Sequence, residues 1–142
     1  MPKIEKILEV VRGWVTKAEN DLKTAALTLK GGKDAPTDTV CFHAQQCIEK
    51  YLKALLTLKN IDFPKTHDIE KLLDLLPANI DLPLSIKQQR QLTGYATAAR
   101  YPGDYEEIST AEAQQALRIA RRIRKEIRSL LGESLKKPGK SA

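Results

Sequence analysis

The sequence predicts an all-α protein built as a single antiparallel up-and-down bundle of four to five helices. Charged residues make up 30% of the chain and aromatic residues only 5%. The dominant residues, Ala, Leu, Ile, Lys, Glu, Arg and Gln, favour helix over sheet. A chain of 142 residues has room for one ordinary domain. We expect residues 1–135 to form the bundle domain and residues 136–142 to form a disordered basic tail.

The first two expected helices are the longest in the first half of the chain. From Ile4 to about Lys30, apolar residues recur every three or four positions, which is the spacing of one helix face. Gly31 and Gly32 provide a stop signal for this helix. A second helix is expected from about Pro36 to Lys59, with Asp34 as its N-terminal cap.

Three more helices are expected after a loop that contains Pro64. A short third helix is predicted from His67 to Leu76, and a fourth from about Leu84 to Arg100. The segment "STAE", Ser109 to Glu112, is a capping box that opens a fifth helix. An apolar stripe continues along that helix to Leu131.

The composition also indicates a compartment. No apolar run approaches the roughly 18 residues that span a bilayer, and charge interrupts the N-terminus too often for a signal peptide. Cys41 and Cys47 lie six positions apart on one expected helix, where their thiols cannot meet. We therefore expect a cytoplasmic protein with no contact to a membrane.

The expected second helix carries a cluster of Cys, His and Gln residues in "CFHAQQCIEKYLKALL", residues 41–56. Cys47 falls within the apolar stripe, while His43, Gln46, Lys50 and Lys53 fall at helical spacing on the other side. His43 with Cys47 offers too few ligands for a metal site, and no third group would orient His43 as a base for a thiol. We expect a polar helix face, no metal and no cofactor.

The segment "ARYPGDYEE", residues 99–107, has two interpretations. Arg100 could bind a phosphate while Tyr101 and Tyr105 offer ring faces to a base, which would make a nucleotide pocket. Alternatively, Arg100 satisfies the last carbonyls of its helix, and the tyrosines pack as half-buried residues.

The net charge of +6 lies entirely in the last quarter of the chain, since residues 109–142 hold nine basic and three acidic side chains. Such a run could follow the phosphate backbone of RNA, or it could be a solvated helix face. The candidate contacts to a polyanion are Arg118, Arg121, Arg124 and Arg128.

Four segments in order, "DLKTAALTL", "CFHAQQCIEKYLKALL", "KTHDIEKLL" and "ARYPGD", give the chain a resemblance to the HEPN domains of stand-alone prokaryotic proteins. The resemblance implies a compact bundle of four or five helices, commonly dimeric and often encoded beside a minimal nucleotidyltransferase. Many relatives are ribonuclease toxins that use an arginine followed by a histidine after four to six residues.

This chain departs from the ribonuclease pattern, because neither His43 nor His67 has an arginine five to seven positions upstream. His43, Gln45, Gln46 and Lys50 belong to the recurrent second-helix signature, so the resemblance implies that they lie at an interface or on a polar face.

The resulting hypothesis is a non-catalytic nucleotide-binding and interaction module, acting as a homodimer with a minimal nucleotidyltransferase in a toxin-antitoxin system. One alternative is a metal-independent ribonuclease toxin whose rearranged site uses His43 or His67 with Arg100. Another is an RNA-binding helical protein.

Overall fold

The computed structural model describes residues 3–96 and 107–136. Within these residues it contains five α-helices and two short 3-10 helices, and the all-α bundle is confirmed. The α-helices are α1 (Ile4–Leu29), α2 (Thr37–Leu58), α3 (Ile69–Asp74), α4 (Ile86–Ala96) and α5 (Thr110–Leu131), and the 3-10 helices are η1 (Gly32–Asp34) and η2 (Gly132–Leu135).

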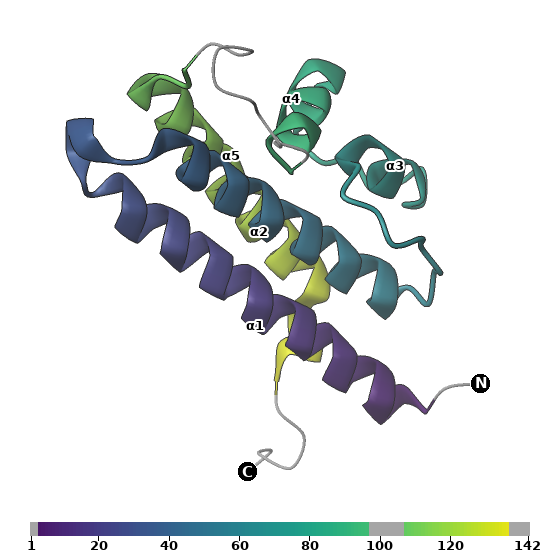
Figure 1. Ribbon diagram of the computed structural model, residues 1–142. Coiled ribbons are helices and arrows are strands. Elements are labelled where there is room, and N and C mark those ends of the chain that lie inside the picture. The colour runs from purple at the N-terminus through teal and green to yellow at the C-terminus, as the bar shows by residue number, and fades with distance from the viewer. Residues whose placement is uncertain (1–2, 97–106, 137–142) are drawn as a thin grey trace.

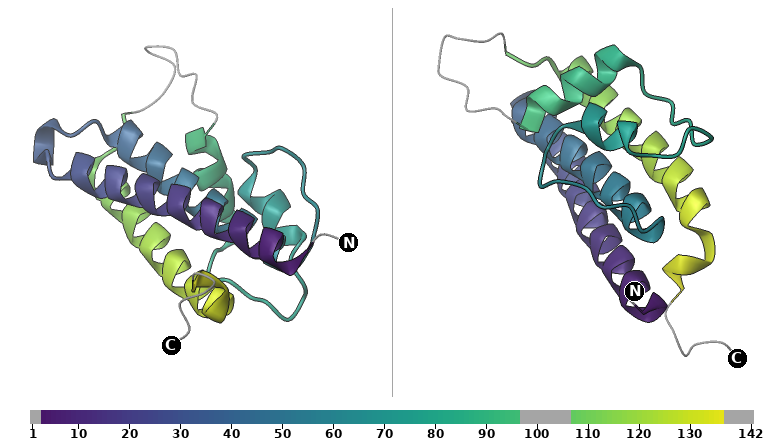
Figure 2. Two further views of the ribbon diagram at one scale, coloured as in Figure 1. Left: turned by 90° about the horizontal axis from the view of Figure 1, so that it is seen from below. Right: turned by 90° about the vertical axis from the view of Figure 1, so that its right-hand side faces the viewer.

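The three long helices pack side by side, and the short helices α3 and α4 lie against one side of α2 (Figures 1 and 2). α2 returns antiparallel to α1 after the turn that contains η1. The hydroxyl of Thr37 donates to the backbone oxygen of Ile108 at 2.6 Å, so α2 and α5 begin close together. Both helices then run in the same direction, opposite to α1.

α2 is the central helix of the bundle, and 14 of its 22 residues are buried. It packs against α1, α5, α4 and α3, so apolar side chains are needed around most of its circumference. The largest fully buried side chains in the core include Tyr51, Ile48, Leu52, Leu55 and Leu56, all from α2. No helix among the described residues is long and apolar enough to cross a membrane.

The helix caps agree with the sequence in part. Ser109 accepts a hydrogen bond from the backbone N–H of Glu112, as the capping box predicts. The prediction that Asp34 caps α2 is wrong: Asp34 lies in η1, and the N-cap position of α2 is Pro36, which has no side-chain cap. Asn60 follows α2 with a φ of 56°, a left-handed conformation that Asn tolerates.

The third and fourth helices begin later in the chain than the sequence predicted. The third helix spans only Ile69–Asp74, because Asp68 caps it by accepting from the backbone N–H of Lys71. α4 begins at Ile86 rather than Leu84, and its predicted end at Arg100 lies outside the described residues. Residues 137–142 of the predicted tail also lie outside them.

A partly buried carboxylate connects the three long helices. Glu19 of α1 accepts two hydrogen bonds from the guanidinium of Arg124 on α5, at 2.7 and 2.9 Å. It also accepts one from the hydroxyl of Tyr51 on α2, at 2.7 Å. Arg128 donates to the same hydroxyl at 3.2 Å. Burial alone would raise the pKa of Glu19, but the hydrogen bonds from Arg124 and Tyr51 outweigh it and lower the pKa.

Glu19→Gln should make the protein less stable near neutral pH and should change how stability depends on acid. The folded-state pKa of Glu19 lies below its ordinary value of 4.5, so its stabilising contribution is present above that pH and is lost as the pH falls through the folded-state pKa. The stability difference between wild type and variant should therefore shrink from about pH 7 to about pH 3, as measured by urea unfolding.

Glu9→Gln is the matched control, because Glu9 is exposed on the same helix and forms a weak ion pair with Lys6, at 3.9 Å. A difference between wild type and Glu19→Gln that stays constant over this pH range would contradict the assigned role of the carboxylate.

Candidate functional site

Six polar side chains share one side of α2, and we call them the α2 polar face. At about 100° of rotation per residue they fall within an arc of about 160°. They are His43, Gln45, Gln46, Glu49, Lys50 and Lys53. The sequence predicted a polar face here, but most of it is buried: Gln45, Gln46, Glu49 and Lys53 are all shielded from solvent. Buried polar groups require hydrogen-bond partners, which come from α1 and from the segment that precedes α3.

The first cluster of the α2 polar face is centred on Asp21 of α1. One carboxylate oxygen of Asp21 lies 2.8 Å from Nδ1 of His43, and the other accepts a hydrogen bond from Nζ of Lys50. A carboxylate can only accept, so Nδ1 of His43 carries the hydrogen in this contact. Asp21 thus fixes the orientation of the His43 ring and neutralises the nearest lysine.

The second cluster is centred on Glu49, within α2 itself. One carboxylate oxygen accepts from Nε2 of Gln45 at 2.9 Å and lies 2.8 Å from Nδ1 of His67. The other oxygen accepts from Nζ of Lys53 at 2.9 Å. Gln45 also contacts the backbone oxygen of His67 and accepts from Nε2 of Gln46 at 2.7 Å. Each buried polar atom of this cluster therefore has a partner.

Aromatic rings cover the lysine of the second cluster. Nζ of Lys53 lies 5.5 Å from the ring centre of Trp14 and 6.0 Å from that of Phe63. The two rings contact each other in a tilted arrangement, with centroids 6.4 Å apart. Cation–π attraction adds to the ion pair with Glu49 at this position.

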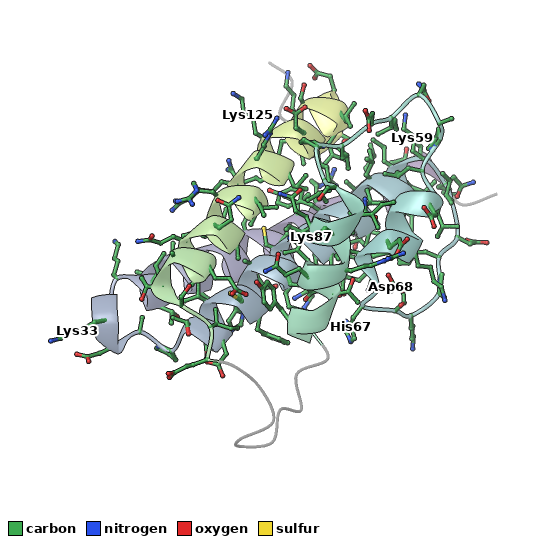
Figure 3. The ribbon with its side chains drawn as sticks, turned by 90° about the horizontal axis from the view of Figure 1, so that it is seen from above. Lys33, Lys59, His67, Asp68, Lys87 and Lys125 are labelled. Atoms are coloured by element: carbon green, nitrogen blue, oxygen red, sulfur yellow. The ribbon has the colours of Figure 1, made fainter. Side chains whose placement is uncertain are left out.

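The two clusters repeat one arrangement, in which a carboxylate holds Nδ1 of a histidine and the ammonium of a lysine. Among the residues that the structure describes, Nε2 of each histidine has no hydrogen-bond partner. His43 is partly exposed, and the side chain of His67 is 61% exposed at the edge of the molecule (Figure 3). An oriented imidazole can move a proton. However, the lysine beside each ring is already paired with the carboxylate that holds the ring.

The cysteines of α2 play no part in these clusters. Cys47 is part of the hydrophobic core, and burial raises the pKa of its thiol well above the ordinary value of 9.0. Such a thiol is inert as a nucleophile. Within residues 3–96 and 107–136, no group of three or more His, Cys, Asp or Glu side chains could hold a metal ion.

The residues predicted to bind a nucleotide are not part of the two clusters. Arg100, Tyr101 and Tyr105 lie outside the described residues. The last turn of α4 before them carries Tyr95, whose hydroxyl donates to the carboxylate of Glu112. The pKa of Tyr95 is raised above its usual value, mainly by burial and secondly by this hydrogen bond.

The four arginines predicted to contact a polyanion have different environments. Arg124 and Arg128 are turned toward α1 and α2, where they bind Glu19 and Tyr51. Arg118 is exposed and, among the described residues, donates only to the neutral side chain of Gln115. Arg121 is also exposed. Only the exposed pair is available for a partner molecule.

Sequence reasoning missed the acidic partners, Asp21 and Glu49. A signal was present, because Asp21 opens the segment "DLKTAALTL" and Glu49 lies within "CFHAQQCIEKYLKALL". His67 comes from the third segment, "KTHDIEKLL". Three of the four segments that carry the resemblance thus supply the residues of the two clusters.

A sequence profile of the HEPN domain matches residues 11–130, which include both clusters. The chain belongs to the HEPN family. A protein of Methanocaldococcus jannaschii named "Putative toxin MJ1304" is 28% identical over 146 residues, covering 84% of this HEPN chain and 87% of that protein. The crystal structure of TT1696 from Thermus thermophilus is similar with a TM-score of 0.72 at 28% identity, covering 84% and 96% of the two chains.

Removing the carboxylate of the second cluster should destabilise this HEPN domain strongly. Glu49→Ala leaves the ammonium of Lys53, which is only 9% exposed, without its counter-ion. Breaking a buried pair in this way is expected to lower the free energy of unfolding by about 3–5 kcal/mol, measured by urea unfolding. Glu70→Ala is the control, because it removes the more exposed pair with Arg90 and should change the same quantity by about 0–1 kcal/mol.

A second variant separates the unpaired charge from the lost side chain. Glu49→Gln combined with Lys53→Met removes both charges and keeps an oxygen that can accept from His67. It should be more stable than Glu49→Ala. Equal urea midpoints for wild type and Glu49→Ala would show that the pair does not hold the second cluster together.

Proposed function

We propose that this HEPN domain is a non-catalytic interaction module that acts as a homodimer with a minimal nucleotidyltransferase in a toxin-antitoxin system. The observation that supports a non-catalytic role is that the charged groups of both histidine clusters are paired with one another. Asp21 and Glu49 each bind a histidine and the lysine nearest to it.

Cleavage of RNA without a metal needs a proton-transferring group next to a cation that binds the phosphate. In the first cluster, Lys50 is paired with Asp21. In the second, Lys53 is buried, paired with Glu49 and covered by Trp14. Neither lysine is placed to bind a phosphate beside its histidine. The absence of an arginine five to seven positions before either histidine agrees with this proposal.

The toxin-antitoxin context is supported by the name of the M. jannaschii relative. The resemblance of the sequence to stand-alone HEPN proteins supports the nucleotidyltransferase partner. Arg100, Tyr101 and Tyr105 are assigned to a mononucleotide on the sequence alone, and calorimetric titration of wild type and Arg100→Ala measures that role.

The surface proposed for the dimer contact is the solvent-facing part of the α2 polar face. Phe42 lies on the same side of α2, packs edge-on against the His43 ring and is 39% exposed. An exposed aromatic ring beside partly exposed polar groups is typical of the centre of a protein contact.

Purified wild-type protein should leave both structured RNA and messenger RNA intact, as followed by gel electrophoresis, because its histidines lack a neighbouring phosphate-binding cation. The second candidate function, a ribonuclease with a rearranged site, is favoured by one observation: His67 is exposed while Glu49 orients its ring. Cleavage that disappears in both His67→Ala and Arg100→Ala, but persists in the exposed control Lys65→Ala, would establish that candidate and overturn the non-catalytic proposal.

Light scattering should give a mass twice that of the 15.9 kDa chain at micromolar concentration and above. Phe42→Asp should convert the dimer to a monomer, because it places a charge at the proposed contact. Leu27→Asp is the matched control, since Leu27 is a 58% exposed apolar residue on α1. A monomer at all concentrations would refute the homodimer. Equal loss of the dimer in both variants would show that the contact is not specific to α2.

A further inference from the structure

Four cations form a single row along the exposed side of α5. Arg118, Arg121, Arg122 and Lys125 follow one another at i, i+3, i+4 and i+7. At about 100° per residue this spacing confines them to an arc of about 100°, and at 1.5 Å of rise per residue the row is about 10.5 Å long. We call this row the α5 cationic stripe.

The α5 cationic stripe points away from the bundle. The buried residues of α5 include Ala113, Ala120, Ile123 and Ile127, and their mean direction is opposite to that of the stripe. All four cations of the stripe are exposed. In Figure 3 the side chain of Lys125 extends from α5 away from the other helices.

The charges of the stripe are not neutralised within the part of the chain that the structure describes. Arg118 donates to the neutral oxygen of Gln115. No carboxylate among the described residues lies within ion-pair distance of Arg121, Arg122 or Lys125. The exposed acid on the same helix, Glu126, lies at i+4 from Arg122, at the edge of the row, but no ion pair joins the two side chains.

This arrangement works against the stability of α5. Arg118 with Arg122 and Arg121 with Lys125 are like-charge pairs at i, i+4, which destabilise a helix, whereas alternating signs would stabilise it. A face that served solubility alone could carry charges of both signs. Arg124 and Arg128, by contrast, are used inside the fold. The helix therefore keeps separate cations for internal contacts and for the outward row.

The shape of the stripe selects the class of ligand. It is a straight row of cations without an exposed apolar side chain among them, whereas a stable protein contact has an apolar or aromatic centre. A nucleic acid strand places one phosphate about every 3.4 Å along a duplex axis, so a row of about 10.5 Å spans about three phosphate spacings and can contact about four phosphates. Arginine forks suit phosphate oxygens.

We propose that the α5 cationic stripe binds the phosphodiester backbone of a nucleic acid without reading its bases. The proposal is independent of the proposed function, because it concerns α5 rather than the α2 polar face. It also differs from the sequence prediction, since it replaces Arg124 and Arg128 by Arg122 and Lys125.

The test measures binding of a fluorescent single-stranded RNA of about 20 uridines by anisotropy, between about 50 and 200 mM salt. Four phosphate contacts predict that log K falls with log salt with a slope of about −2.8 for a single strand. The triple variant Arg121→Gln, Arg122→Gln, Lys125→Gln should bind at least about tenfold more weakly at the lowest salt, and its slope should be shallower by about 2. Circular dichroism checks that the variant keeps its helix content.

The matched control removes the same three charges elsewhere, through Lys33→Gln, Lys65→Gln and Lys87→Gln. These lysines are exposed and lie in η1, before α3 and in α4; Lys33 and Lys87 are labelled in Figure 3. The control triple should keep the wild-type slope. Equal losses of RNA affinity in the two triple variants would show that binding depends on net charge alone and would overturn the proposal.

Binding of two further kinds of polyanion, duplex nucleic acid and polyglutamate, defines the class of ligand. Duplex RNA and duplex DNA test whether the backbone alone suffices, and binding of either with the same loss in the stripe variant supports the proposal. Polyglutamate tests for an acidic protein. Tighter binding of polyglutamate than of RNA, or no binding of any nucleic acid by wild type at the lowest salt, would refute it.

Discussion

Carboxylates that are taken out of water must be met by hydrogen-bond donors, and this constraint organises the bundle around α2. Glu19, Asp21 and Glu49 each receive at least two donors, and most of these come from a different part of the chain. Apolar packing specifies the relative position of helices less sharply than paired polar groups do, because apolar cores can be repacked before stability is lost. Each carboxylate accepts its partners in only one alignment. Glu19 and Asp21 therefore fix how α1 and α5 sit against α2, and Glu49 fixes the segment before α3 against α2.

The helices themselves could be predicted because burial and sequence period are directly linked. The apolar period of α1 and α2 and the cap at Ser109 depend only on neighbouring residues. The cap assigned to Asp34 failed for the same reason, since the chain used Asp34 in a 3-10 turn that local pattern did not distinguish from a cap.

The candidate site was only half predictable. A helical wheel gathers His43, Gln46 and Lys50 on one side of α2, but it contains no information on how deeply that side is buried. Burial of this side depends on partners that are distant in the sequence. Asp21 lies 22 residues before His43, and His67 lies 18 residues after Glu49. The same limit applies to α5, where sequence spacing could not separate the arginines used for internal contacts from those that face solvent.

The position of these contacts along the chain has a consequence for the order of assembly. Both clusters of the α2 polar face are complete once residue 67 has left the ribosome, because they need only α1, α2 and the segment before α3. The bond between Glu19 and Arg124 spans 105 positions and must wait for nearly the whole chain. The polar contacts between α1 and α2 can therefore form before α5 has been synthesised, and the docking of α5 is then the remaining long-range step.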